Sequence, residues 1–165
     1  MEYLGIYDNE GKPTGRKVVR GDKNVILNEN EHIAVSIIFI ENDQGEFLIQ
    51  KASKEKGSYF SSTGGHIDFG ETPLSTIKRE VEEELGIIVE EKEIRPCGFF
   101  NNEKSLIFLY YLKKNINIED MNLQTEEVDY VKYMSIDEIK KLIEEDKMLK
   151  SHGLMFKEIL KIKTN

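Results

Sequence analysis

The chain has 165 residues, a length that favours a single domain over residues 1–165 with a real hydrophobic core. Its formal net charge of −8 argues against a general affinity for a nucleic acid polymer or an anionic membrane. Cys97 is the only cysteine, so no intrachain disulfide can form, and the first residues lack the pattern of a signal peptide. We therefore expect a cytoplasmic protein without nucleic acid or membrane partners.

Turn formers divide the chain into short strands and a few helices. Residues 1–30 predict an N-terminal hairpin, with strands at 3–7 and 14–19, followed by a polar loop. The polar stretch 52–62 predicts a second loop. Apolar and β-branched runs predict further strands at 32–40, 47–49, 87–89, 94–100, 106–112 and 128–134.

Three segments have helical periodicity, and the clearest of them covers residues 72–85. Thr72 is a credible N-cap, Pro73 suits the first helical position, and Gly86 ends the helix. Two later helices are expected at 135–145 and 151–161. Strands that alternate with a few helices indicate a mixed sheet with helices packed on it.

The first predicted helix gathers acids at positions i, i+3 and i+4 on one side: Glu80, Glu83 and Glu84. A glutamate-rich helix face is more often a solvated surface. Carboxylates held so close repel one another, however, and Mg²⁺ relieves this repulsion because it prefers oxygen ligands. The preceding Gly64-Gly65 pair is expected in a loop, where the backbone can approach a ligand closely. Arg79 can pair with a carboxylate and hold the acids in position.

The whole segment 65–87 resembles the Nudix box, which reads Gly, five residues, Glu, seven residues, Arg-Glu, an apolar residue, any residue, Glu-Glu, any residue, Gly and an apolar residue. Every specified position matches: Gly65, Glu71, Arg79, Glu80, Val81, Glu83, Glu84, Gly86 and Ile87. The resemblance implies the α/β Nudix fold, an α/β/α sandwich with a central mixed β-sheet. It also implies a hydrolase, a pyrophosphatase that uses Mg²⁺ or Mn²⁺ to cleave the diphosphate linkage of a nucleoside diphosphate derivative.

The same resemblance assigns expected roles to individual residues. The metal ligands are expected to be Glu80, Glu83, Glu84 and the Gly65 carbonyl. Glu71 would support this cluster and Arg79 would orient it. Nudix enzymes take the general base from the box or from a later loop, so Glu83 is the first candidate, with Glu126 and Glu127 as the alternatives.

Basic side chains close to the box are candidates for holding substrate phosphates: His66, Lys51 and Arg20. Each of them has an ordinary packing or surface role as its alternative. Cys97 has no paired base nearby in sequence and is expected to be a packed thiol. The expected partner is a small-molecule diphosphate, and a homodimer is an alternative to a monomer because dimers are common in the family.

Two rival functions stay open. The hairpin and residues 51–66 also resemble the Nudix branch that includes isopentenyl-diphosphate isomerase, which uses a cysteine nearby. Residues 60–66 contain no cysteine, so a hydrolase of this isomerase-like branch is preferred over the isomerase. The second rival is a nucleotide-sensing Nudix domain without catalysis, but sensors can lose the box acids, and this chain keeps them all. The sequence marks that identify individual Nudix substrates are not found, so the substrate stays open.

Overall fold

The structure is a computed structural model that describes residues 1–103 and 105–163. Strands dominate it, and they are β1 (Tyr3–Tyr7), β2 (Pro13–Val19), β3 (His32–Glu41), β4 (Phe47–Ala52), β5 (Phe60–Ser61), β6 (Thr63–His66), β7 (Arg95–Asn102), β8 (Ser105–Lys113) and β9 (Val128–Met134). The helices are α1 (Pro73–Leu85), α2 (Ile136–Glu144) and α3 (Lys150–Lys163), with short 3₁₀ turns η1 (Lys54–Lys56), η2 (Glu91–Glu93) and η3 (Ile118–Asp120). None of the helices in the described ranges has the length and apolar character needed to cross a bilayer.

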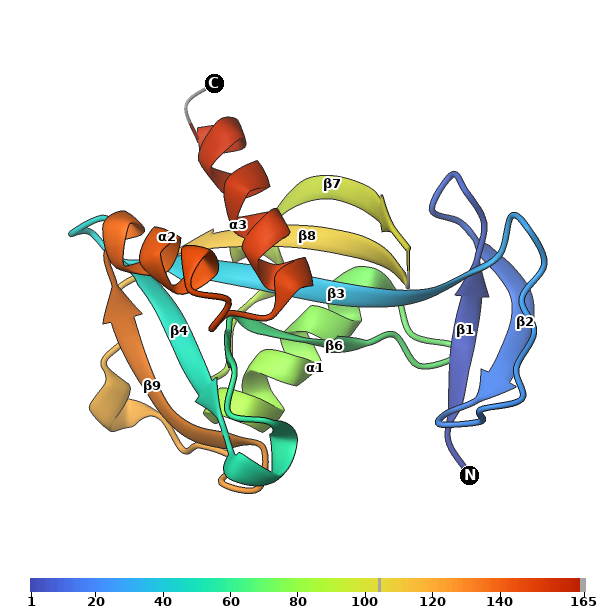
Figure 1. Cartoon of the computed structure of the whole chain (residues 1–165), viewed down its shortest axis with the longest axis horizontal. Coiled ribbons are helices and arrows are strands. Elements are labelled where there is room, and N and C mark those ends of the chain that lie inside the picture. Colours follow the sequence, from blue (N-terminus) through green and yellow to red (C-terminus); the bar gives the residue numbers. More distant parts are fainter. Residues whose placement is uncertain (104, 164–165) are drawn as a thin grey trace.

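The long strand β3 organises a mixed sheet (Figure 1). It runs parallel to β8, from the pair Ala34–Leu106 to the pair Glu41–Lys113, and antiparallel to β6. Strand β4 meets the end of β3 and pairs along its length with β9, while β7 pairs with β8. The β1–β2 hairpin joins the start of β3. As a result, the strand that leads into α1 lies beside the centre of the sheet.

Helices cover both faces of this sheet (Figure 1). Successive side chains of β3 point to opposite faces, so Ile38 packs with Ile77 and Val81 of α1, whereas Phe39 packs against Phe156 of α3. Helix α2 shares the second face with α3. The expected α/β/α sandwich around a mixed sheet is therefore confirmed.

Local sequence explains where α1 begins and ends. The Thr72 hydroxyl accepts a hydrogen bond from the Ser75 N–H, and the Ser75 hydroxyl accepts one from the Thr72 N–H, both at 3.0 Å. Pro73 occupies the first turn, where its missing N–H costs nothing. Gly86 ends the helix at a φ of 69°, and a Cβ there would lie 2.5 Å from the Asn122 carbonyl oxygen, so only glycine fits. The predicted boundaries of this helix are confirmed.

Two expectations about local structure are wrong. Residues 87–89 do not form a strand, although Val89 is buried; after Gly86 the segment passes to η2 without pairing to any strand among the described residues. Gly64 and Gly65 lie in β6 and not in a loop, because their backbones pair with β3. The predicted loop at 52–62 is also partly ordered, as it contains η1 and β5.

Candidate active site

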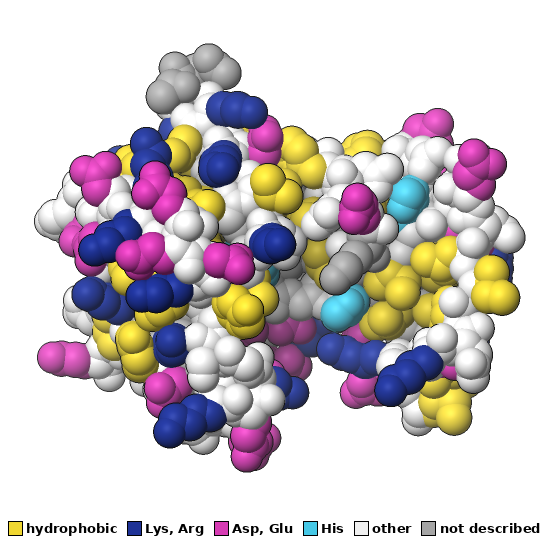
Figure 2. Space-filling model, viewed as in Figure 1, with side chains coloured by type: hydrophobic (Ala, Val, Ile, Leu, Met, Phe, Trp, Pro, Cys, Tyr) yellow, Lys and Arg dark blue, Asp and Glu magenta, His cyan; other side chains and the backbone are white. Residues whose placement is uncertain are grey.

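A cleft of about 670 Å³ opens beside β6 and the acidic side of α1. Figure 2 shows a hollow between the N-terminal hairpin and the rest of the molecule, in which acidic, basic and histidine side chains lie close together. Most of the residues selected from the sequence line this cleft: Arg20, Gly65, His66, Arg79, Glu80, Glu83, Glu84 and Glu127. The sheet, the hairpin and two helices therefore bring together groups that lie far apart in the chain.

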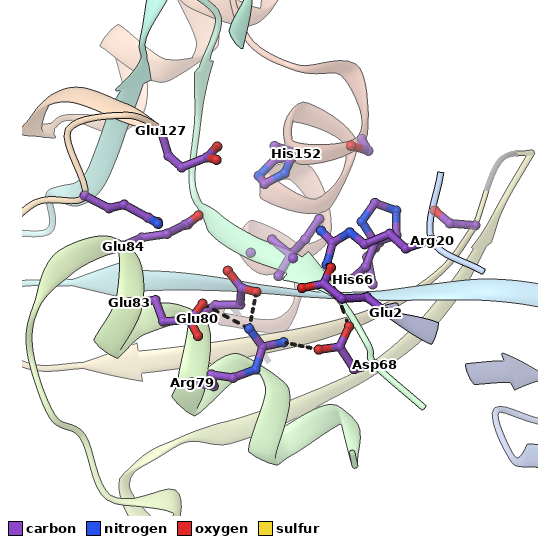
Figure 3. Close-up of a pocket in the computed structure, with 17 residues that line it drawn as sticks. Glu2, Arg20, His66, Asp68, Arg79, Glu80, Glu83, Glu84, Glu127 and His152 are labelled. Atoms are coloured by element: carbon purple, nitrogen blue, oxygen red, sulfur yellow. Dashed lines mark hydrogen bonds and ion pairs between the residues drawn. The ribbon is translucent and has the colours of Figure 1, made fainter. Parts of the chain in front are cut away.

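Arg79 connects the acids of the box (Figure 3). Its Nε and Nη2 donate to the two oxygens of Glu71 at 2.7 and 2.9 Å, a bidentate pair. Its Nη1 donates to Glu80 at 2.8 Å and to Glu83 at 3.0 Å. Burial alone would raise the pKa of Glu71, but the hydrogen bonds and charge of Arg79 outweigh this effect and hold the pKa below its usual value. One guanidinium thus fixes three carboxylates.

Glu84 lies deeper than the other acids of the cluster and has no such cation. Its side chain is buried at 9% exposure, and its Oε2 accepts no hydrogen bond from any residue in the described part of the chain. Burial raises the pKa of Glu84 to about 8, and the negative charge of Glu80 acts in the same direction. Burial also raises the pKa of Glu80, although the charge of Arg79 opposes the shift. Glu84 in particular is therefore short of positive charge.

Gly65 packs directly against the Glu80 carboxylate, so a larger residue here would displace this side chain. A Cβ at Gly65 would come within 2.4 Å of the Glu80 carboxyl group, far inside van der Waals contact. At Gly64 a Cβ would meet the Ser36 carbonyl oxygen at 2.6 Å, so this glycine allows the close approach of β6 and β3. The glycine pair thus serves the packing of a strand against α1, a role that the loop interpretation missed.

Basic and polar groups form the opposite part of the cleft wall (Figure 3). Arg20, which follows β2, lies 3.7 Å from both Glu2 and Asp68. One Asp68 oxygen is buried without a hydrogen-bond donor among the residues described. Burial lowers the pKa of His66, and the charge of Arg20 lowers it further. His66 is therefore neutral at pH 7, and Arg20 supplies the positive charge of this wall.

Three residues considered from the sequence lie outside the cleft wall. Lys51 extends from β4 over the Phe60 ring, with its ammonium 4.4 Å from the ring centroid. Glu126 does not line the cleft, but its carbonyl accepts a hydrogen bond from Ser53. Cys97 is half-buried in β7 against the core, and burial raises the pKa of its thiol, so the packed-thiol prediction is confirmed.

Sequence reasoning missed several other residues that line the cleft, among them Gln124 and His152. His152 belongs to α3, and its Nδ1 lies within hydrogen-bond distance of Ser62, ninety positions earlier. No local motif marks either residue. For His152, the sequence offered only its position near the start of the predicted last helix, which does not indicate a role in a cleft.

The donor set fits a hard divalent cation. Carboxylate and carbonyl oxygens are the ligands such ions prefer, and the orphaned Oε2 of Glu84 is a buried acceptor that a cation would satisfy. Within residues 1–103 and 105–163, no three His, Cys, Asp or Glu side chains already surround one common point. Arg79 instead takes up oxygens of Glu80 and Glu83, so these two side chains would turn to bind an ion.

Comparisons with known proteins agree with this fold. The family model for the NUDIX domain matches residues 30–154. An uncharacterized Nudix hydrolase of Listeria monocytogenes is 30% identical over 146 residues, which cover 86% of this chain and 85% of the relative. An 8-oxo-dGTP diphosphatase of Haemophilus influenzae is 29% identical over 110 residues, 64% of this chain and 79% of that protein. The crystal structure of DR0079 from Deinococcus radiodurans has a TM-score of 0.78 at 18% identity and covers 94% of this chain and 98% of its own.

The sandwich fold and the complete box thus define a class of enzyme, the hydrolases that act on phosphoric anhydride bonds. Within this class, the chain belongs to the NUDIX domain family and is a Nudix hydrolase. Nudix hydrolases cleave diphosphate bonds in nucleotide derivatives and generally use divalent metal ions.

Proposed function

We propose that this enzyme uses Mg²⁺, or Mn²⁺ in its place, to hydrolyse the diphosphate linkage of a small nucleoside diphosphate derivative in this cleft. The observation that carries the proposal is the cluster on α1, where Arg79 holds Glu80 and Glu83 while Glu84 keeps a buried oxygen without a donor. A cleft of about 670 Å³ is of the size that usually encloses one small ligand.

In this proposal the metal is held by oxygen ligands from β6 and α1: Glu80, Glu83, Glu84 and the Gly65 carbonyl. When bound, the cation supplies positive charge that offsets the charge of the diphosphate and activates water for attack. Glu84 is buried and closely packed, so it fixes the ion at the bottom of the cleft. Glu80 rests against Gly65, which limits where its carboxylate can move.

Arg79 is a positioning residue in this reaction. Its bidentate pair with Glu71 anchors the guanidinium at the start of α1, and its third nitrogen reaches Glu80 and Glu83. The Glu71 carboxylate is itself held by the Thr76 hydroxyl at 3.2 Å. This arrangement keeps the acids close to one another before a ligand arrives, which is the purpose of a preorganised site.

Glu83 is the first candidate for the general base. Its side chain is 51% exposed, so it can reach water in the cleft more easily than Glu80, which is 12% exposed. Glu127 is the alternative, since it lines the cleft just before β9, although Lys56 lies 3.3 Å from its carboxylate. Glu126 is less well placed because it does not line the cleft.

Arg20 and His66 are the proposed contacts for the substrate phosphates. Both line the cleft, and Arg20 is the only one of the two that carries charge at pH 7. Lys51 was a further candidate, but its ammonium over Phe60 favours a packing role. Arg20 is provided by the hairpin, so the first thirty residues are proposed to take part in substrate binding.

We also infer the setting of the reaction. The single cysteine and the net charge of −8 support a cytoplasmic enzyme whose partner is a small-molecule diphosphate and not a nucleic acid polymer or a membrane. Light scattering on the purified protein distinguishes a monomer from the homodimer considered above.

The test is a panel of nucleoside diphosphate derivatives with Mg²⁺ or Mn²⁺, scored by phosphate release after phosphatase treatment. The panel includes 8-oxo-dGTP, after the name of the Haemophilus influenzae relative, and isopentenyl diphosphate. Glu83→Gln removes the first candidate base, and Glu82→Gln is the matched control because Glu82 is exposed on the same helix outside the cleft. We expect metal-dependent turnover in the wild type and the control and a loss of at least about a hundredfold in Glu83→Gln.

Each other outcome rejects a defined part of the proposal. Formation of dimethylallyl diphosphate from isopentenyl diphosphate would assign the isomerase reaction instead. Full turnover in Glu83→Gln would remove Glu83 as the base, and the same measurement on Glu127→Gln would then decide for or against Glu127. Binding of the nucleotides without any turnover would indicate a sensor.

A further inference from the structure

Helix α3 brings a histidine into the cleft from the face of the sheet opposite α1. His152 lies in the first turn of α3 and lines the same cleft as the box glutamates. In Figure 3 its ring extends from the helix into the space between Glu127 and Arg20. None of the roles assigned above to the box or to the hairpin includes this side chain.

The hydrogen bonds of His152 determine which ring nitrogen carries the proton. The Ser62 backbone N–H donates to Nδ1 at 3.2 Å, and the Ser62 hydroxyl lies 2.9 Å from the same nitrogen. A backbone N–H can only donate, so Nδ1 must offer its lone pair. The neutral ring therefore carries its hydrogen on Nε2, on the other side of the imidazole.

This Nε2–H has no acceptor within the described residues of the chain, and His152 lines the cleft. Burial lowers the pKa of His152 to about 4, so the ring is neutral at pH 7. Ser62 therefore holds the ring at Nδ1, and Nε2–H is a fixed donor without an acceptor among the described residues.

The surroundings of the ring indicate what kind of acceptor it meets. The cleft also contains carboxylates such as Glu127 and Glu83, which offer no N–H or O–H when ionised. A diphosphate presents many acceptor oxygens and needs donors on the side away from the metal. A neutral donor can meet one of these oxygens without adding a positive charge that would compete with the metal for the carboxylates.

We propose that His152 positions the substrate by donating a hydrogen bond from Nε2–H to a phosphoryl oxygen of the diphosphate, with Ser62 fixing the tautomer. The inference rests on the proposed function, because the ligand is the same diphosphate. His152 is a binding and positioning residue in this account, and it neither gives up nor takes a proton during the reaction.

Two substitutions separate the donor from the packing of the ring. His152→Gln places an amide N–H near the position of Nε2 and keeps a donor in the cleft. His152→Asn can still accept from Ser62 but is too short to present a donor at that point. With the most rapidly hydrolysed member of the panel, we expect His152→Asn to raise KM about tenfold while kcat stays within about threefold of wild type, and His152→Gln to restore KM to within about threefold. Thermal unfolding confirms that both variants are folded.

A spectroscopic measurement tests the same contact without turnover. Long-range ¹H–¹⁵N spectra of ¹⁵N-histidine-labelled protein identify the tautomer, and the His152 signals are assigned by their absence in His152→Gln. We expect the Nε2–H form in the free protein and a shift of its Nε2 signal when Mg²⁺ and imidodiphosphate, an analogue with a P–N–P bridge, are added. Calorimetry on the same sample shows whether the analogue binds.

The outcomes separate this inference from the proposed function. A protonated Nδ1, an unchanged Nε2 signal despite bound imidodiphosphate, or a wild-type KM in His152→Asn would each overturn the role of His152 while leaving the hydrolase intact. If the panel shows no hydrolysis but the Nε2 signal responds to bound imidodiphosphate, the proposed function fails and the diphosphate contact of His152 stands.

Discussion

Two buried glutamates of this enzyme differ in how their oxygens are satisfied. Glu41, at the end of β3, is 2% exposed, and it accepts a hydrogen bond from the Tyr111 hydroxyl and pairs with the Lys163 ammonium. Glu84, in the last turn of α1, is 9% exposed and has an oxygen without a donor among the described residues. The first glutamate ties the sheet to α3, whereas the second is free to take a ligand.

This difference shows how a structural carboxylate can be told from a functional one. Burying a charge is costly unless a partner and hydrogen bonds compensate it, so a carboxylate that only stabilises the fold has its partners within the protein. A buried carboxylate that lacks them destabilises the fold, and in the proposed function a bound cation provides the missing positive charge.

The largest expected effect comes from removing the charge of the unsatisfied glutamate. Glu84→Gln keeps the shape of the side chain but removes a proposed metal ligand, so we expect kcat at saturating Mg²⁺ to fall on the order of a hundredfold to a thousandfold. The free energy of unfolding without metal should rise at pH 7, because the substitution removes the cost of burying a carboxylate that lacks a partner. The measurements are steady-state hydrolysis and urea unfolding.

Glu82→Gln again serves as the control for a charge change on α1. The rise in Tm that Mg²⁺ causes in the wild type should also disappear in Glu84→Gln, because a ligand stabilises only the state that binds it. Undiminished hydrolysis in Glu84→Gln would mean that Oε2 of Glu84 does not bind the metal. A buried carboxylate oxygen without a donor would then not indicate a functional glutamate.

The satisfied glutamate should show the opposite pattern. Glu41→Gln breaks the pair with Lys163 and weakens the contact with Tyr111, so we expect the free energy of unfolding to fall by about 1–3 kcal/mol. The value lies below that of a fully buried pair, because Lys163 is 28% exposed and can turn towards water. Activity per folded molecule should be unchanged.

Urea unfolding of Glu41→Gln is compared with that of Glu144→Gln, an exposed acid on α2 that lies outside the cleft. If Glu41→Gln lowered kcat without lowering the free energy of unfolding, hydrogen-bonded partners would not distinguish a structural glutamate from a functional one.

His152 lies between these two cases, since one ring nitrogen is satisfied and the other is not. The folded pKa of about 4 lies below the usual value of 6.5, so the unfolded chain binds a proton first as pH falls. The contribution of the neutral ring is fully present above about pH 6.5 and is lost between pH 6.5 and 4. We expect the wild type to lose on the order of 2 kcal/mol more than His152→Gln over this interval.

Urea unfolding of both proteins at several pH values measures this difference, since the other groups titrate equally in the two. Parallel stability curves for wild type and His152→Gln would show that the ring is not kept neutral by its surroundings.

The sequence predicted the parts of this enzyme that depend on neighbours in the chain. Helix α1 and its ends follow from Thr72, Pro73 and Gly86, whose roles are local. The clustering of the box acids also follows from helical spacing alone. Their connection through Arg79 was expected in outline, and the structure adds its anchor on Glu71.

The remaining errors concern features that only tertiary packing determines. Residues 87–89 have the composition of a strand, but no strand in the described part of the chain pairs with them. A pair of glycines is typical of a loop, but Gly64 and Gly65 form a strand because their backbones pair with β3. Neighbouring residues of a strand point to opposite sides of the sheet. In β4 the Gln50 side chain contacts Thr63, whereas the Lys51 ammonium lies over the Phe60 ring and outside the cleft wall.

The parallel pairing of β3 with β8 has a consequence for synthesis. Ala34 cannot find Leu106 until the ribosome has added the residues between them, which takes several seconds at about 5–20 residues per second. During this time the apolar run 37–40 lacks its parallel neighbour, and unpaired apolar strands are prone to aggregate. Slower initiation of translation or a lower growth temperature should therefore raise the yield of soluble enzyme, because fewer incomplete chains are present to meet one another.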